Sequence, residues 1–283
     1  MSEQVIDTDS RPSVQADKLP LNLKIGMVVV TAWVLLAVLA PWVTPADPNA
    51  LDLDNVLQPP GAAGLMGTDQ VGRDVFTRVV FAARIDLWIG FAGVVLPLLI
   101  GVMAGLFSGY FGGAADALLM RVVDITLAFP FFVLVLAIVA ALGPGVGNLI
   151  IALALVGWVS YARLVRAEVM VIRHAEYIQA VRTLGFSRFY ILFRHVMPNA
   201  LAPVIVYAMT DMLLVILAGA GLGFIGLGVQ PPTAEWGVMI ADGQPYIEEA
   251  WWISLFPGLA AISFGIGLSL IGDGLARMLR VSN

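Results

Sequence analysis

Three kinds of side chain are missing or scarce in this chain of 283 residues: cysteine is absent, histidine occurs twice, and the only lysines are Lys18 and Lys24. The lack of cysteine excludes disulfides, thiol catalysis and cysteine metal sites. A phosphate-binding loop needs a lysine after a glycine-rich turn, and neither lysine follows one, so nucleotide chemistry is expected on another polypeptide. The histidines are 21 residues apart, and no Gly-x-Ser-x-Gly elbow occurs. We therefore expect no enzyme activity, no cofactor, no metal site and no nucleic-acid partner.

Charge is also scarce. Charged residues make up 12% of the chain, hydrophobic residues make up 60%, and the mean hydropathy is +0.92. Soluble domains carry about 25% charged residues, so this composition indicates a protein of the lipid bilayer. Two long runs, Leu87–Ala115 and Ile125–Ala162, contain no charge at all. A membrane helix needs about 20 apolar residues, so the first run predicts one span and the second predicts two.

The apolar runs predict an all-α integral membrane protein with six transmembrane helices. The glycines and proline of 143–148 form a turn signal that divides the longest run. A cleaved signal peptide is an alternative for the first run, although its 19 residues are more than such a segment usually has. The predicted spans are 25–43, 87–109, the two halves of 125–162, 200–227 and 250–271.

The distribution of arginine and lysine predicts the orientation. With the N-terminus in the cytoplasm, twelve of these residues lie in cytoplasmic segments and only three lie outside. Both termini are then cytoplasmic. The predicted layout is a cytoplasmic tail 1–24, a first helix 25–43, an external segment 44–86, a core domain 87–276 with five helices and the cytoplasmic segment 168–199, and a cytoplasmic tail 277–283.

A short basic amphipathic stretch, "YIQAVRTLGFSRFYILFRHVMPN" at 177–199, interrupts the apolar sequence. Its spacing predicts a short helix that Gly185 ends. Ser187 is expected to cap a second helix, and Pro198 to begin the fifth span. Three interpretations are open on physical grounds: a helix lying on the bilayer surface, a helix docked in a groove of a soluble partner, or a loop folded onto its own bundle.

This stretch resembles the cytoplasmic motif of permease subunits of binding-protein-dependent ABC importers. Gln179, Ala180, Val181, Gly185 and Pro198 match it, with glutamine in place of the family's glutamate and valine in place of its second alanine. Two further stretches, "GTDQVGRDVFTR" at 67–78 and "GLGVQPPTAEWG" at 226–237, resemble the dipeptide, oligopeptide and nickel permease group. The likeness covers about residues 26–276; Ala234 stands where the group usually has proline, and the group's usual aspartate-proline ending is missing.

The resemblance implies the type I ABC importer permease fold in a bacterial inner membrane. It also implies a second, homologous permease, two cytoplasmic ATPases that hold ATP and magnesium, and an external solute-binding protein. The helix 177–185 is then the element that couples the ATPases to the permease. Peptides are the expected cargo, with nickel or another metal complex as the alternative, and a channel or receptor without an ATPase as the alternative of a different class. The implied coupling residues are Tyr177, Gln179, Ala180, Arg182, Gly185, Ser187 and Pro198.

Asp211 is the one charged residue inside the predicted fifth span. A carboxylate in hydrocarbon costs about 2.5–3.5 kcal/mol on insertion scales, so we expect it to face a polar interior. It is a candidate pore-lining acid that meets the cationic group of a passing solute. The alternative is a neutral or hydrogen-bonded acid, with Thr210 or a partner subunit as its contact.

Four glycines, Gly101, Gly105, Gly109 and Gly113, recur every four residues along the second span. This spacing places them on one helix face, where small residues let two backbones approach closely. Static packing is the favoured interpretation, and a seam along which helices slide is the alternative.

Overall fold

The fold is helical throughout the range that the structure describes. The structure, a computed structural model, describes residues 19–281. Within that range there is no strand, only an isolated bridge between Thr68 and Asp74. Most of the predicted tail 1–24 and the last two residues of the predicted tail 277–283 lie outside the described residues. The α-helices are α1 Leu21–Val38, α2 Ala40–Val43, α3 Val75–Phe111, α4 Gly113–Leu127, α5 Phe131–Leu142, α6 Val146–Ile172, α7 Glu176–Thr183, α8 Arg188–Ile191, α9 Met197–Phe224, α10 Trp236–Gly243 and α11 Trp252–Val281.

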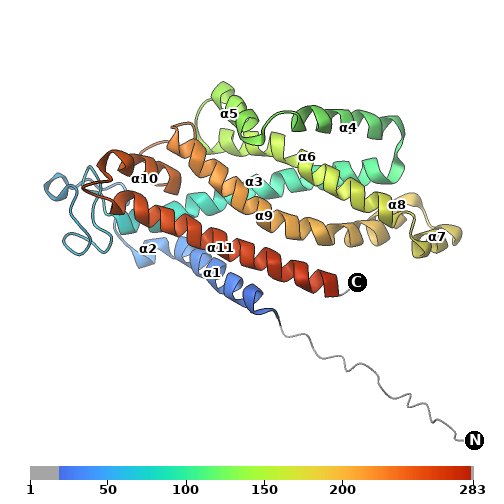
Figure 1. Ribbon diagram of the computed structural model, residues 1–283, viewed down its shortest axis with the longest axis horizontal. Helices are drawn as coiled ribbons and strands as arrows, with labels where there is room; N and C mark the ends of the chain where they lie inside the picture. Colours follow the sequence, from blue (N-terminus) through green and yellow to red (C-terminus); the bar gives the residue numbers. More distant parts are fainter. Residues whose placement is uncertain (1–18, 282–283) are drawn as a thin grey trace, which may run out of the picture.

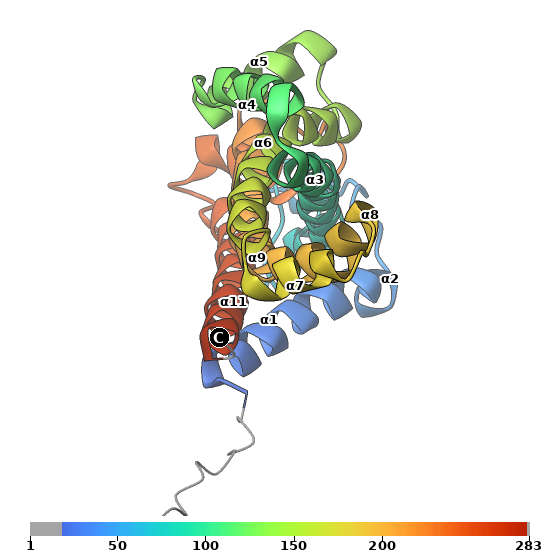
Figure 2. The ribbon, with the colours of Figure 1, turned by 90° about the vertical axis from the view of Figure 1, so that its right-hand side faces the viewer.

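The long helices α3, α6, α9 and α11 run along the long axis of an elongated bundle (Figure 1). Helix α1 packs mainly against α11, on the side away from α4 and α5 (Figures 1 and 2). One end of the bundle, here called the α7 end, carries residues 173–196. The opposite end, here called the α10 end, carries residues 44–74 and 228–251. Among residues 19–281, five helices are long and apolar enough to cross a membrane, or six if the bent pair α4–α5 counts as one span.

Helix α3 begins at Val75, twelve residues before the predicted second span 87–109. Part of the predicted external segment 44–86 is therefore helical. The hydropathy pattern does not predict this first part of α3, because residues 75–86 include charged side chains. Arg78 and Asp86 are nevertheless only 2% exposed each, and both have polar partners inside the fold. The helix starts where the Asp74 carboxylate accepts a hydrogen bond from the Thr77 backbone N–H at 2.7 Å.

The predicted third span, the first half of 125–162, is not one straight helix. Helices α4 and α5 meet at an angle of 89° at residues 128–130, where Pro130 disfavours a helical residue before it. Helix α4 begins at residue 113, and its two aspartates pair with arginines of α6. Arg166 donates two hydrogen bonds to Asp116, at 2.6 and 2.7 Å, and Arg163 donates one to Asp124 at 2.6 Å.

Pro198 does not start a separate helix. Residues 188–224 form one continuous helix, in which α8 passes through a π-helical segment, Leu192–Val196, into α9. Proline lacks a backbone N–H and crowds the preceding turn, and a π-bulge is a common local adjustment. The side-chain amide of Asn199 donates to the carbonyl oxygen of His195 at 2.6 Å, which satisfies one acceptor there. The last helix, α11, also runs past its predicted end at residue 271, to Val281.

Three of the four spaced glycines form the contact between α3 and α6. A Cβ atom on Gly101 would lie 2.4 Å from the carbonyl oxygen of Trp158, and one on Gly105 would lie 2.5 Å from that of Ala162. Gly109 faces the next turn of α6 in the same way. Gly113 was wrongly grouped with them, because α3 ends at Phe111 and a Cβ there would meet nothing within 4 Å. The two backbones thus pack as closely as glycine allows.

Candidate functional site

The candidate site is the elbow formed by α7 and the turn into α8, which projects from the α7 end of the bundle (Figures 1 and 2). Ile178 of α7 is fully buried in the main apolar core, and the partly buried Val181 packs against that core. The turn after α7 contains Gly185 at φ +85°, a conformation that other residues rarely adopt. Ser187 then caps α8, because its Oγ accepts a hydrogen bond from the Tyr190 N–H at 3.3 Å.

Gln179 fastens the elbow to the end of α6. Its side-chain amide Nε2 donates a hydrogen bond to the backbone carbonyl oxygen of Arg173 at 2.9 Å. An ionised glutamate has no proton to donate in this place. Of the two departures from the resembled motif, the glutamine at position 179 therefore makes a contact that an ionised glutamate could not make.

The outward surface of the elbow is partly apolar. Tyr177, Leu184 and Phe186 are 46%, 75% and 47% exposed, and Ala180 and Arg182 are exposed beside them. The rings of Phe186 and Tyr190 stack with their centroids 4.9 Å apart. Because large apolar side chains gathered at an exposed tip are typical of a contact surface, this face has the character of a docking element.

A cavity of about 760 Å³ opens beside the elbow, between α6, α7, α9 and α11. Tyr177 and Pro198, two of the predicted coupling residues, line it together with Asn199. The Tyr177 hydroxyl accepts a weak hydrogen bond from the Asn199 amide at 3.3 Å. The structure thus brings the predicted coupling residues together at one end of the bundle, with a hollow behind them.

Asp211 lies away from this elbow, in the interior of the bundle. It is 9% exposed, and its Oδ2 accepts a hydrogen bond from the hydroxyl of Tyr161 on α6 at 2.7 Å. The ring of Tyr207 packs against Tyr161 at 5.1 Å. Tyr161 could not be predicted from the sequence, because 50 residues separate it from Asp211 and no local pattern links them. Thr210, the contact that the sequence suggested, makes no hydrogen bond to Asp211 within residues 19–281.

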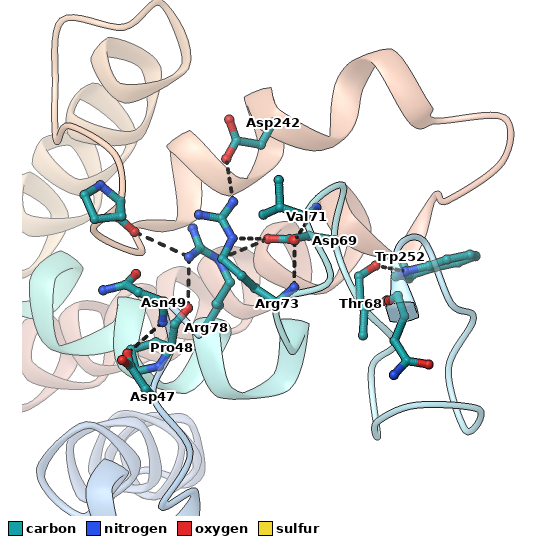
Figure 3. A network of polar contacts seen from close by, with 12 residues as sticks. Asp47, Pro48, Asn49, Thr68, Asp69, Val71, Arg73, Arg78, Asp242 and Trp252 are labelled. Atoms are coloured by element: carbon teal, nitrogen blue, oxygen red, sulfur yellow. Dashed lines mark hydrogen bonds and ion pairs between the residues drawn. The ribbon is translucent and has the colours of Figure 1, made fainter. Parts of the chain in front are cut away.

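A buried network of charges holds the α10 end together (Figure 3). The sequence alone does not predict this network. Asp69 Oδ2 accepts from Arg73 Nε at 2.6 Å and lies 3.6 Å from Arg78 Nε. Arg73 Nη2 lies 3.7 Å from Asp242 of α10. Arg78 also donates to the carbonyl oxygen of Pro48 at 3.1 Å. The stretch 67–78, noted above only as a resemblance, therefore ties the chain before α3 to α10.

The stretch 226–237 fixes α10 through two buried acids. Both oxygens of Glu235 accept backbone N–H groups at the start of α10, those of Gly237 and Val238, at 2.8 Å. The second acid, Asp86 of α3, accepts a hydrogen bond from the Trp236 backbone N–H at 3.1 Å. Burial raises the pKa of Glu235. Helix α10, which follows this stretch, packs onto α9 and α11.

The contact between Gln179 and Arg173 predicts the effect of restoring the family's residue. Gln179→Glu removes the donor, so the free energy of local opening should fall by about 1 kcal/mol. The backbone amides of residues 177–184 should then exchange hydrogen faster. Glu176→Gln, a charge change on the same helix, is the matched control. Equal exchange rates in Gln179→Glu and the unmodified protein would show that the bond contributes nothing.

Comparisons with known proteins agree with this architecture. Residues 101–281 match the family described as "Binding-protein-dependent transport system inner membrane component", and residues 24–60 match the "N-terminal TM domain of oligopeptide transport permease C". The dipeptide transport system permease protein DppC of Alkalihalophilus pseudofirmus is 43% identical over 89% of this chain and 83% of its own length. The di/tripeptide transport system permease protein DppC of Pseudomonas aeruginosa is 43% identical over 88% of this chain and 84% of its own.

A solved structure shares the fold. A chain of the inward-facing MetNI methionine ABC transporter has a TM-score of 0.58 and 18% identity, over 73% of this chain and 96% of that one. At this identity the likeness concerns the fold alone. The family match spans well over half of the sequence and includes α6, the elbow and α9. The chain belongs to the family of inner-membrane components of binding-protein-dependent transport systems.

Proposed function

We propose that this chain forms half of the translocation pathway of an ATP-driven importer of di- and oligopeptides, beside a second, homologous permease. The chain is a multi-pass inner-membrane protein, and its relatives named above are dipeptide and di/tripeptide permeases. The observation that carries the proposal is the exposed elbow at one end of a bundle of membrane-length helices. Two ATPases, which bind ATP and magnesium, and an external solute-binding protein complete the proposed assembly; this chain itself holds no cofactor.

The proposed topology has six crossings and two cytoplasmic termini. The bent pair α4–α5 makes the third crossing, within a core that spans residues 87–276. The α7 end is then cytoplasmic and the α10 end external. The excess of arginine and lysine in the segments assigned to the cytoplasm supports this orientation.

The helices around the elbow suggest how movement enters the bundle. Gln179 joins α7 to the end of α6, and the unbroken helix 188–224 joins the other side of the elbow to the middle of α9. A push on α7 by an ATPase cleft therefore acts on two helices at once. These helices carry Tyr161 and Asp211, whose hydrogen bond links them inside the membrane.

Asp211 is proposed to line the pathway and to meet the amino group of the peptide. Asp211→Asn keeps an oxygen that accepts from Tyr161 but removes the charge, so uptake of a dipeptide should fall several-fold in the assembled transporter while the protein stays folded. Asp273→Asn, at an exposed site on α11, is the control. Wild-type uptake with an unaltered preference among solutes would leave Asp211 with a structural role only.

The proposed assembly and cargo are tested by purification and transport. The chain should copurify with an ATPase subunit when expressed with its genetic neighbours, whereas a channel or receptor would be isolated without one. Proteoliposomes with the binding protein should accumulate dipeptide on addition of ATP. Accumulation of nickel without dipeptide would favour the metal alternative within the same class.

A further inference from the structure

Two hollows meet at Arg84 and Trp88 of α3, near the α10 end. The first, of about 580 Å³, lies between α1, α3, α9 and α11, and every other residue that lines it is apolar. The second, of about 470 Å³, lies on the loop side, where Asn49 and Thr233 contribute polar side chains. Arg84 and Trp88 line both hollows. The combined space is therefore apolar on one side, mixed apolar and polar on the loop side, and positively charged between the two.

The geometry of α3 sets the level of this junction in the membrane. The charge-free run begins at Leu87, and about 20 helical residues at 1.5 Å each cross the roughly 30 Å of hydrocarbon. Arg84 lies one turn before that run, which places it among the lipid headgroups. Trp88 lies one turn further along and is 55% exposed, as is typical of the aromatic residues at a membrane interface.

The charge of Arg84 is not used within the fold. Among residues 19–281 its guanidinium makes no ion pair, and it lies 6.0 Å from the centroid of the Phe81 ring. Arg73 and Arg78, the other arginines near this end, are both paired with Asp69. An exposed arginine at headgroup level, above an apolar groove and without an acidic partner, is complementary to an anionic amphiphile.

We propose that this double hollow binds an anionic phospholipid. The phosphate contacts Arg84, an acyl chain lies in the groove along Val34 of α1 and Phe91 of α3, and headgroup hydroxyls reach Asn49 and Thr233. A helix of the partner permease fits the apolar groove less well, since it would bring an apolar surface to an unpaired arginine. The proposal is independent of the cargo and of the coupling mechanism proposed above.

The test compares lipid retention in the assembled transporter purified in detergent. Phosphatidylglycerol and phosphatidylcholine are added in equal amounts, and the bound lipid is measured by mass spectrometry. The wild type should retain phosphatidylglycerol in preference, and Arg84→Gln should bind it about fivefold more weakly. Arg121→Gln, which removes an exposed arginine on α4, is the control and should not change retention.

A second variant tests the groove. Val34→Trp fills it without changing the charge, so it should reduce the retention of either lipid. Equal retention of phosphatidylglycerol by the wild type, Arg84→Gln and Val34→Trp would overturn the proposal, as would equal binding of the two lipids by the wild type. A photoreactive amino acid at position 88 should cross-link to lipid; cross-linking to the partner permease instead would also overturn it.

Discussion

Gly185→Arg should reduce ATP-driven uptake severely while the permease itself stays folded. Gly185 has φ +85°, and a Cβ atom there would meet nothing within 4 Å. The substitution therefore creates no clash inside the chain and costs only about 1–2 kcal/mol of backbone strain. It does place a long charged side chain on the exposed turn that, in the proposed assembly, enters the ATPase cleft. We expect ATPase stimulation and uptake to fall by about tenfold or more, because a docked helix needs close contact with its groove.

The measurement is the ATPase rate of proteoliposomes with and without the binding protein, together with copurification of the ATPase subunits. Gly61→Arg is the matched control: it has φ +89°, it also has open space around its Cβ, and it lies at the α10 end. It should leave coupling unchanged. If assembly and stimulation both survive Gly185→Arg, the docking hypothesis fails. A helix that merely lies on the bilayer would tolerate the added arginine, since its charge would face lipid phosphates.

The elbow was predictable from sequence because its determinants are local. A glycine at a helix end and a serine before the next helix act through their own backbone, and Gly185 and Ser187 do so here. The apolar runs likewise located the membrane helices. The hydropathy pattern failed to predict helix where charged side chains form ion pairs. Arg78 lies in residues 75–86 of α3 and Asp116 lies at the start of α4, and the partners of both lie elsewhere in the chain.

Contacts that depend on tertiary structure could not be predicted. The hydrogen bonds from Tyr161 to Asp211 and from the Trp236 backbone to Asp86 each join residues far apart in sequence. Nothing in the local sequence around either acid indicates which residue it meets. The resemblance pointed to the two stretches at the α10 end, and only the structure shows that they fasten α10 to α3.

Gly101→Leu should prevent the permease from folding stably, because α3 and α6 have no space for a side chain at this contact. A Cβ on Gly101 would lie 2.4 Å from the backbone oxygen of Trp158 and 2.5 Å from the Cβ of Tyr161. Neither neighbour is the end of a flexible side chain, so the helices must separate. Overpacking costs typically about 1–3 kcal/mol, and the upper end is expected here since the next turn, at Gly105, is equally close. The yield of monodisperse protein in detergent and its Tm should both drop.

The control for this change is Gly258→Leu in α11, where a Cβ would meet nothing within 4 Å. Both substitutions place leucine within a long membrane helix, so a general effect on insertion or helix propensity would be seen in both. A loss confined to Gly101→Leu would show that close backbone packing holds α3 against α6. A Gly101→Leu protein with the yield and Tm of the wild type would instead mean that the two helices separate readily, as a sliding seam requires. The contact between α3 and α6 would then change during transport. Tyr161, which lies beside Gly101 at this contact, would shift with α6 and so displace its hydrogen-bond partner Asp211.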